Sequence, residues 1–308
     1  GHGDGLLSTI CLAFTKSLFI APAMNPDMWN NKITQASIEK LDAAEIKMIG
    51  PNYGSHACGD IGYGRMTHPE EIIEKIKDNS KTSQLSGCKI LITAGPTREP
   101  IDPVRFMSNY SSGKMGYEMA IAAKSKGASV ELISGPVTLK PIPDIKTTYV
   151  ETSSEMYDVV KSKVDHYDIF ISTAAIADYK PANYSDIKYK KDENNIFIEF
   201  TRGIDILQTI SKKYENLFTV GFAAETNSLS ENTKDKLQKK NLDVIVGNIA
   251  NHELKLGFES DYNEVIILSN TGSENISLDK KSNIAARILD FIAKEYSSKL
   301  ELIKKDVK

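Results

Sequence analysis

The stretch that decides the fold is Lys89–Gly116, KILITAGPTREPIDPVRFMSNYSSGKMG. It opens with an apolar, β-branched run, Ile90–Thr93, whose composition is typical of a buried strand. A polar loop with three prolines follows, and Ser111–Lys114 then opens a helical pattern. The first N–H groups of a helix have no partners inside the helix, and the helix dipole places a partial positive charge at that end. The stretch therefore predicts an anion site at the carboxyl end of a strand.

This stretch is not a standard nucleotide-binding motif, because it lacks both GxGxxG and the GxxxxGKS/T pattern of a P-loop. An ordinary loop between a strand and a helix is the alternative interpretation. A functional loop is favoured because it contains Arg98, Arg105, Asn109 and Lys114. Loops on a rigid scaffold commonly hold functional residues.

Length, charge and cysteine content limit the possible classes of protein. The 308 residues suggest about two domains. The net charge of -3 favours neither nucleic acid nor an anionic membrane as a partner. Three cysteines without a CxxC pair suit a reducing cytoplasm and argue against a disulfide framework or a zinc site. No apolar run reaches the about 18 residues of a membrane span, and we find no signal-peptide pattern.

Strands and helices alternate along most of the chain. The patterns predict helices at 3–14, 32–44, 69–77, 153–165, 205–214, 229–240 and 281–296, and strands at 18–22, 46–49, 90–93, 130–133, 147–150, 169–175, 196–200, 219–223, 244–246 and 265–268. The polar segment 78–87 lacks periodicity and is predicted to be a linker. This alternation predicts an α/β fold with a doubly wound, mostly parallel sheet, whose ligands bind at the carboxyl ends of the strands.

Charged residues follow the 169–175 strand. Asp178 lies just beyond its carboxyl end, and Lys188, Lys190 and Lys191 follow about ten residues later. An acid for Mg²⁺ or ribose and lysines for phosphate would suit a nucleotide, although a solvated charged loop is an equally good interpretation.

A second lysine-rich segment follows the 219–223 strand. Lys236 and Lys240 are four residues apart, so they share one face of the predicted helix. They could bind phosphates, but the residues alone favour a solvated helix face.

Cys58 lies between His56 and Asp60 in a glycine-rich loop, 56–66. Zinc usually needs four ligands, so a mobile flap carrying an acidic thiol is the preferred interpretation. Cys11 and Cys88 are predicted to be small buried apolar residues.

Taken together, these stretches resemble the bacterial bifunctional family of coenzyme A biosynthesis, in which a phosphopantothenoylcysteine decarboxylase precedes a phosphopantothenate–cysteine ligase. The ligase resemblance covers residues 88–308 through five motifs in order, ITAGPTREPIDPVRFMSNYSSGKMG, IADYKP, IKYKK, GFAAET and KKNLDVIVGN. The decarboxylase resemblance covers residues 1–77 through PAMNPDMW and ACGDIGYGRM. The resemblance implies a Rossmann-like ligase domain at 88–308, preceded by a partial flavodoxin-like decarboxylase domain.

In that family a flavin-binding βα unit with the catalytic histidine begins the decarboxylase domain. It would precede Gly1, so we expect a longer natural protein and no decarboxylation by this chain alone. The resemblance still implies that Asn25 holds the substrate carboxylate and that Cys58 donates a proton. FMN would serve the full-length decarboxylase.

For the ligase the resemblance implies a two-step reaction. The carboxylate of phosphopantothenate attacks the α-phosphate of CTP, which releases pyrophosphate and forms an acyl-cytidylate. The amine of cysteine then displaces CMP. Cations near the phosphates and Mg²⁺ on the triphosphate would stabilise the developing charge.

The same motifs imply residue roles. Lys188 matches the catalytic lysine, and Asn109 matches the asparagine that handles the acyl intermediate, a task that suits a neutral donor and acceptor. The substrate-binding residues would be Asn25, Ser111, Ser112, Gly113 and Lys114. The nucleotide-binding residues would be Ser172, Thr173, Ala174, Asp178, Lys188, Ile204, Asp205, Ile206, Leu207, Phe222, Lys236 and Lys240. The metal ligands stay unassigned.

One segment departs from the family pattern. Thr201–Leu207 lacks the proline that the family often has in its nucleotide pocket. The preference for CTP over ATP follows from the bacterial type of the resemblance alone.

The resemblance also implies a cytoplasmic homodimer built through the ligase domain, a larger homo-oligomer of the full-length protein, and neither nucleic acid nor membrane as a partner. Two alternatives stay open. The chain could be an assembly fragment without activity, or another nucleotide-binding α/β enzyme, although the absent GxGxxG counts against the second.

Overall fold

The computed structural model describes residues 3–14, 17–44, 46–56, 59–80, 84–189, 197–225, 229–249 and 260–306. The chain divides into two compact units, Gly1–Thr82 and Ser83–Lys308.

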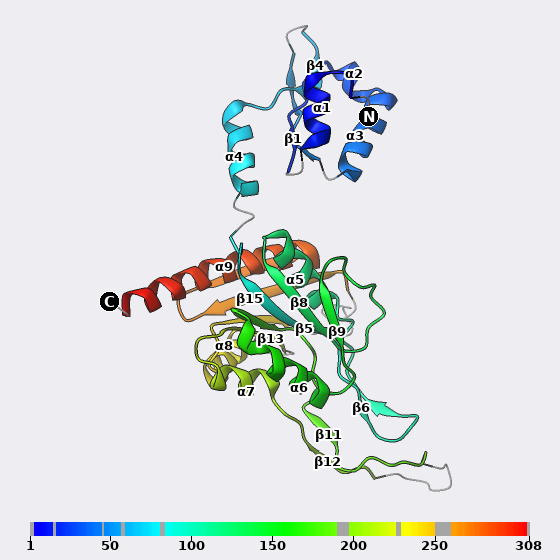
Figure 1. The fold of residues 1–308 in the computed structure, drawn as a ribbon, viewed down its shortest axis with the longest axis vertical. Coiled ribbons are helices and arrows are strands. Elements are labelled where there is room, and N and C mark those ends of the chain that lie inside the picture. The colour runs from blue at the N-terminus through cyan, green and yellow to red at the C-terminus, as the bar shows by residue number, and fades with distance from the viewer. Residues whose placement is uncertain are drawn as a thin grey trace. The chain divides into compact units, whose positions relative to one another are not determined.

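An eight-stranded sheet forms the centre of the second unit (Figure 1). Its strands are β5 (Lys89–Ala94), β8 (Ser129–Ser134), β9 (Lys146–Tyr149), β10 (Ile169–Ser172), β13 (Phe218–Glu225), β14 (Val244–Ile249), β15 (Tyr262–Ser269) and β16 (Ser273–Lys280). Their order is β16-β15-β14-β13-β10-β5-β8-β9, and the six strands from β14 to β9 are parallel. Numbered along the chain, these six follow the 3-2-1-4-5-6 order of a Rossmann-like fold, which confirms the predicted doubly wound sheet.

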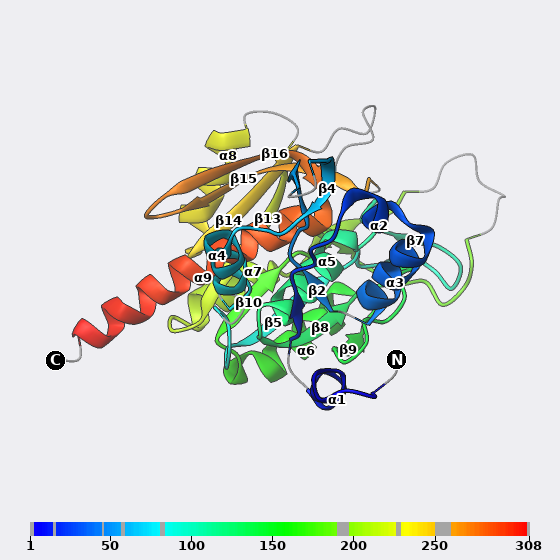
Figure 2. The ribbon, with the colours of Figure 1, turned by 90° about the horizontal axis from the view of Figure 1, so that it is seen from above.

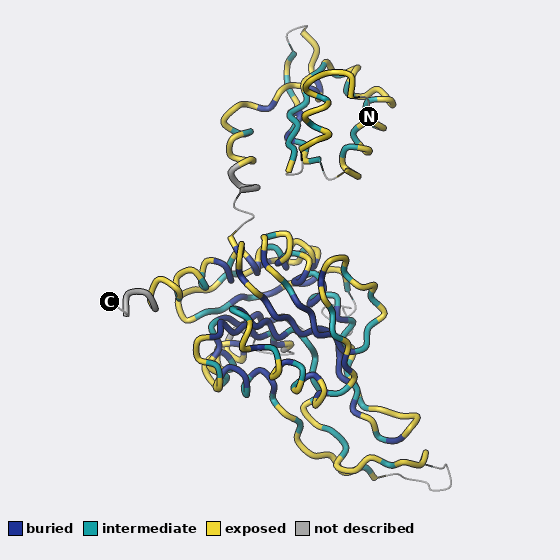
Figure 3. The backbone as a smooth tube through the Cα atoms, in the orientation of Figure 1, coloured by how far each residue is buried: buried dark blue, intermediate teal, exposed yellow. Residues whose placement is uncertain are grey.

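Helices cover both faces of this sheet. On one side lie α5 (Lys114–Ser125) and α9 (Lys281–Asp306), and on the other α6 (Ser153–Lys163), α7 (Ile206–Lys213) and α8 (Leu229–Lys239), with a short 3-10 turn, η2 (Val164–His166), after α6. Side chains alternate along β5: Ile90 and Ile92 join the buried cluster under α5 and α9, and Leu91 joins the opposite one. Figure 3 shows long buried stretches along the central strands of this sheet.

The sheet ends in an antiparallel hairpin, β15–β16, seen in orange at one edge in Figure 2. Sequence reasoning missed β16, because only Ile276 is buried along its polar sequence, SENISLDK. A polar edge strand has no alternation strong enough to be recognised. The last helix, predicted at 281–296, continues to Asp306.

Two short ribbons project beyond the carboxyl ends of the parallel strands (Figure 1). The proline-rich loop after β5 forms β6 (Glu99–Pro100) and β7 (Phe106–Met107), which pair antiparallel. The loop after β10 forms β11 (Tyr179–Pro181), which pairs with β12 (Phe200–Arg202). The predicted strand at 196–200 is therefore displaced, since 197–199 are not in a strand and residue 196 lies outside the described residues.

The first unit contains α1 (Leu6–Ala13), α2 (Pro26–Asn30), α3 (Lys32–Ala43), α4 (Pro69–Ser80), a parallel pair of β1 (Phe19–Ile20) and β2 (Lys47–Met48), and a hairpin of β3 (Asn52–Ser55) and β4 (Ile61–Arg65). The glycine-rich segment predicted as a loop at 56–66 thus includes strand β4. Among the described side chains of residues 3–76, Ile49 is the only large apolar one that is buried. This unit by itself has little hydrophobic core.

The predicted linker, 78–87, includes ordered structure. Its first residues, 78–80, belong to α4, and Leu85 is 1% exposed in the core of the second unit. Of the cysteines, Cys88 is buried as predicted, whereas Cys11 is partly exposed. No helix among the described residues combines the length and the apolar character needed to cross a membrane.

Candidate active site

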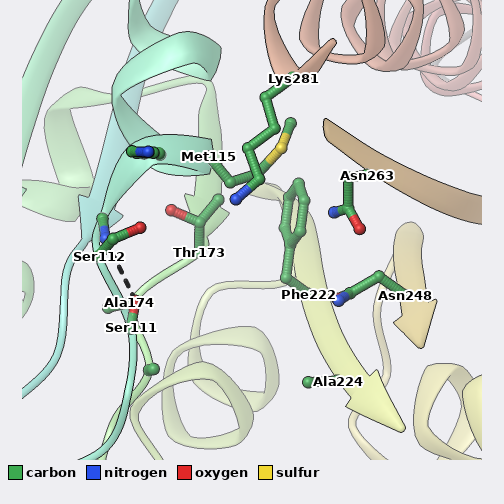
Figure 4. A pocket seen from close by; sticks show the side chains of 14 residues that line it. Ser111, Ser112, Met115, Thr173, Ala174, Phe222, Ala224, Asn248, Asn263 and Lys281 are labelled. Atoms are coloured by element: carbon green, nitrogen blue, oxygen red, sulfur yellow. Dashed lines mark hydrogen bonds between the residues drawn. The ribbon is translucent and has the colours of Figure 1, made fainter. Parts of the chain in front are cut away.

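A small cavity opens at the carboxyl ends of β10, β13 and β14, beside the start of α5 (Figure 4). Its volume is about 140 Å³. β5 and β10, whose following loops reach the cavity, are the neighbours at which the strand order reverses. Ligands of doubly wound folds bind at this topological switch point. The cavity is therefore the strongest candidate for the active site.

Seven of the predicted site residues line this cavity. They come from the loop before α5, from the end of β10 and from β13, and they are Ser111, Ser112, Gly113, Lys114, Thr173, Ala174 and Phe222. The segments that carry them are far apart in the sequence, so the sheet order is what brings them together.

Asn109 ties the loop before α5 to the end of β10. Its side-chain Nδ2 donates to the carbonyl of Ala175 at 2.5 Å, and its Oδ1 accepts from the N–H of Ser111 at 3.1 Å. An asparagine can do both because it carries a donor and an acceptor without a charge. Asn109 thus shapes the loop whose residues line the cavity.

Two glycines allow the close approach of this loop and helix. Gly113 is the N-cap of α5 with φ of 78°, a left-handed conformation that favours glycine. A Cβ on Gly116 would overlap the Thr173 hydroxyl and the Ala94 side chain. The N-terminus of α5 can therefore lie directly against the ends of β5 and β10, where its N–H groups favour an anion.

Two lysines line the cavity. The Lys114 ammonium pairs with Asp261 at 2.6 Å. Lys281, the first residue of α9, is only 4% exposed, and Figure 4 shows its amine reaching into the cavity. Burial and the nearby charge of Lys114 lower the pKa of Lys281 to about 8, and Asp261 acts in the opposite direction. Burial and Asp261 raise the pKa of Glu118 on α5.

Lys188 does not line this cavity. It is exposed on the long connection between β11 and β12, one residue before Tyr189. The N–H of Tyr189 donates to Asp102 at 3.2 Å, and Arg105 Nη2 donates to the Tyr189 carbonyl at 3.0 Å. These bonds attach the segment that carries Lys188 to the loop between β6 and β7.

Asp102 is the centre of that attachment. Its carboxylate accepts from Arg105 Nε at 2.9 Å and Nη2 at 2.6 Å, and from the N–H groups of Val104 and Arg105 at 2.8 Å each. Burial raises the pKa of Asp102, but the hydrogen bonds from Arg105, Val104 and Tyr189 outweigh it and hold the pKa well below its usual range. The loop between β6 and β7 is thus organised around a permanent negative charge.

The other predicted nucleotide residues lie outside the cavity lining. Ser172 is buried in β10, and Asp178 is exposed after it. Asp205 caps α7 by accepting from the N–H of Gln208 at 3.0 Å and pairs with Lys240 at 2.8 Å.

Three of the predicted nucleotide-binding residues lie just before α7 or within it. Ile206 and Leu207 are buried in the core, so contacts of theirs with a ligand would use the backbone. Ile204 is 39% exposed just before α7, and Lys236 lies on α8, away from the cavity lining.

In the first unit, the side-chain oxygen of Asn25 caps α2 by accepting from the N–H of Met28 at 2.8 Å. This cap is a structural reason for asparagine at that position. Cys58 lies outside the described residues.

Sequence reasoning missed three polar residues of the cavity, Asn248, Asn263 and Lys281. Asn248 could have been found, because it lies at the carboxyl end of a predicted parallel strand. Asn263 and Lys281 belong to the β15–β16 hairpin and to the first turn of α9, and no local pattern places these next to the loop after β5.

Comparisons with known proteins agree with this geometry. The family model of the DNA/pantothenate metabolism flavoprotein C-terminal domain matches residues 85–296, and the Flavoprotein model matches residues 1–81. Coenzyme A biosynthesis bifunctional protein CoaBC of Haemophilus influenzae is 41% identical over 97% of this chain and 75% of its own length. The Escherichia coli K12 and Bacillus subtilis proteins of the same name are each 40% identical, over 97% and 95% of this chain and 75% and 73% of their own lengths.

Solved structures give the same result. A crystal structure of the C-terminal domain of a CoaBC protein aligns with a TM-score of 0.60 and 38% identity, covering 70% of this chain and 99% of that domain. A Cab2 variant in complex with phosphopantothenate-cysteine shares the fold, with a TM-score of 0.61 at 18% identity over 77% of this chain and 97% of its own. The chain therefore belongs to the CoaBC family of bifunctional enzymes of coenzyme A biosynthesis.

Proposed function

We propose that this chain ligates cysteine to phosphopantothenate at the expense of CTP, through an acyl-cytidylate, and releases pyrophosphate and CMP. The observation that carries the proposal is the convergence of Ser111–Lys114, Thr173–Ala174 and Phe222 on one cavity at the topological switch point. Relatives that share about 40% of their residues with this chain are named for coenzyme A biosynthesis, which supports the same reaction.

In this proposal the substrate acid lies against the loop before α5. The helix N-terminus and Lys114 offer positive potential to an anionic group. Asn109, already bonded to Ala175 and Ser111, positions the loop beside the acyl carbon. Such fixed donors stabilise charge as it develops and need no rearrangement during the reaction.

Lys188 is proposed to neutralise the α-phosphate during attack by the carboxylate. It reaches the nucleotide from the β11–β12 connection, whose position is set by the bonds of Tyr189 to Asp102 and Arg105. Lys240, paired with Asp205, and Lys236 on α8 are proposed to bind the nucleotide from the opposite side. Binding the nucleotide between separate elements would exclude water from the acyl-cytidylate.

Mg²⁺ is proposed to arrive with the triphosphate and to neutralise part of its charge. Within the described ranges, no group of three or more His, Cys, Asp or Glu side chains could hold a metal ion. Mg²⁺ usually keeps several waters and binds through one or two carboxylates plus substrate phosphates.

FMN-dependent decarboxylation is proposed for the full-length family proteins, of whose length this chain spans about three quarters. The described part of the first unit does not fit a flavin by itself. Ile49 is its only large buried apolar side chain among residues 3–76, and the Asn25 oxygen is engaged as a helix cap. We also propose that the chain forms a homodimer through its ligase domain and that it is cytoplasmic.

CMP release tests the proposal. Purified chain is mixed with phosphopantothenate, cysteine, CTP and Mg²⁺, and Lys188→Ala is compared with Lys212→Ala, an exposed lysine on α7 outside the site. CMP that requires both phosphopantothenate and cysteine, is lost in Lys188→Ala and persists in Lys212→Ala is the expected result. A folded wild-type protein that releases no CMP or AMP, with CTP or ATP, would refute the ligase function.

A further inference from the structure

Resting on the function proposed above, we infer that Lys281 binds the phosphate group of phosphopantothenate and gives the cavity its preference for the phosphorylated acid. None of the five ligase motifs contains this lysine. The inference rests on its placement, on the size of the cavity and on the charges that surround it.

Lys281 lies at the junction of a strand and a helix, and this junction places it in the cavity. Strand β16 finishes at Lys280, and α9 begins at Lys281. The two neighbouring lysines have opposite environments: Lys280 is exposed, whereas Lys281 is 4% exposed and lines the cavity. The N–H of Lys281 donates to the carbonyl of Asp261 at 2.8 Å, which fixes the backbone at this position. The side chain therefore enters the cavity from the start of α9 (Figure 4).

The local charge favours an anion. Lys281 and Lys114 both line the cavity, next to the N-terminus of α5. The nearby carboxylate, Asp261, is 76% exposed and pairs with Lys114. Asn248 and Asn263 add neutral amide groups, which are able to donate hydrogen bonds to a ligand. A phosphate monoester, with a charge of about -1.5 to -2 at neutral pH, matches two cations better than a carboxylate does.

The size of the cavity limits which part of a ligand it holds. Its volume of about 140 Å³ is well below the about 300–1,000 Å³ of pockets that enclose a drug-sized molecule. One tetrahedral anion with a few adjoining atoms suits this space, and a whole triphosphate or nucleoside would extend beyond it. The terminal phosphate of the acyl substrate is thus the fitting occupant.

Binding through Lys281 is expected to depend on pH. The charged groups that act on it are Lys114 on α5 and Asp261 before β15, and Asp261 in turn acts on Glu118 of α5. Strands β13 and β14 present Phe222 and Asn248, which do not titrate. The pKa of Lys281 is about 8, so its amine is charged at neutral pH and loses its charge above pH 8. Affinity for a phosphate should fall in that range. An arginine, with a pKa above about 12, would stay charged.

The test is a calorimetric titration with three probes: phosphopantothenate, pantothenate and CTP. It compares wild type, Lys281→Met, Lys281→Arg and the adjacent exposed control Lys280→Met, which removes the same charge. Loss of a charge-assisted hydrogen bond should weaken phosphopantothenate binding about 10- to 100-fold in Lys281→Met. Binding of pantothenate and CTP should not change, and Lys280→Met should resemble wild type. Lys281→Arg should retain phosphopantothenate binding and lose its decline above pH 8.

Several results would overturn the inference. They are wild-type affinity for phosphopantothenate in Lys281→Met, an equal loss for pantothenate, and a loss for CTP alone. If Lys281→Met does not fold, Lys281→Arg provides the test. The inference is overturned when the phosphopantothenate affinity of Lys281→Arg declines above pH 8 as steeply as that of wild type.

Failure of the proposed function gives a different pattern. Wild type would then release no CMP and bind no phosphopantothenate, and inorganic phosphate becomes the probe. Phosphate binding by wild type that is lost in Lys281→Met supports the anion site, and phosphate binding that persists in the variant overturns it.

Discussion

Replacing Lys281 by methionine is expected to stabilise the fold while it weakens phosphate binding. Lys281 is 4% exposed, and its pKa is lowered from 10.5 to about 8 by burial and by the charge of Lys114. The folded chain therefore holds the ammonium form of this residue less well than the unfolded chain does. Methionine fills a similar volume without a charge and adapts to irregular space.

The size of the effect follows from the shift in pKa. Each pKa unit corresponds to about 1.4 kcal/mol, so the full difference corresponds to about 3 kcal/mol. Water that reaches the amine through the mouth of the cavity reduces this value, and about 1–3 kcal/mol is the expected gain. The destabilisation by Lys281 is fully present below its folded pKa of about 8 and disappears as the pH rises toward 10.5. The advantage of methionine should therefore fall by about half or more between pH 7 and pH 9.5.

The assay must report on the second unit. The single tryptophan, Trp29, lies in the first unit, so hydrogen exchange of the β5 and β10 amides in urea is the appropriate measurement. Wild type, Lys281→Met and Lys280→Met are compared at both pH values. Equal or lower stability of Lys281→Met at pH 7, or a gain that does not change with pH, would refute the reasoning.

Three further substitutions test other parts of the structure. Gly116→Ala should lower the free energy of unfolding by about 1–3 kcal/mol, because the added methyl group overpacks the contact between α5 and the sheet. In the same urea assay the control Gly272→Ala, whose Cβ would meet no atom within 4 Å, should lower it by less than about 1 kcal/mol. Asp102→Asn should lower kcat for CMP release with little change in phosphopantothenate affinity, because it loosens the segment that carries Lys188; an unchanged kcat would contradict that coupling. Leu85→Ala should destabilise the second unit by about 2–5 kcal/mol, and a loss below about 1 kcal/mol would mean that the core does not begin at residue 85.

The fold was predictable where burial leaves a regular pattern. Strands β5 and β10 are continuous apolar runs because both of their faces are covered by helices, and such runs are recognisable in a sequence. β16 could not be found, since an edge strand with one buried residue carries no such pattern. Strands β11 and β12 have three residues each, which is too short for β-strand propensity to predict them. Their pairing depends on a partner across the long connection between them.

The site was predictable only in part. Ser111–Lys114 could be proposed from the sequence because a strand, a loop and a helix start are contiguous there. Lys281 could not be proposed, since its place in the cavity depends on the antiparallel return of β15 and β16 across the sheet edge. Motif order also grouped Lys188, Phe222 and Lys240 into one pocket, whereas of these only Phe222 lines the cavity. Local sequence predicts which residues follow a strand, but the order of the strands in the sheet decides which of these residues lie next to one another.

The late position of α9 in the chain has a consequence for biosynthesis. Lys114 comes from the first parallel βα unit of the second unit, and Lys281 comes from the start of α9, so the cavity is complete only after residue 281 has left the ribosome. Contacts between such distant segments also form slowly, because a long loop must close before they are made. A nascent chain that has folded β5, α5 and β8 would therefore hold half of an anion site. A substrate that binds both halves would stabilise the packing of α9 beside α5, because a ligand that binds only the folded state shifts the equilibrium toward it.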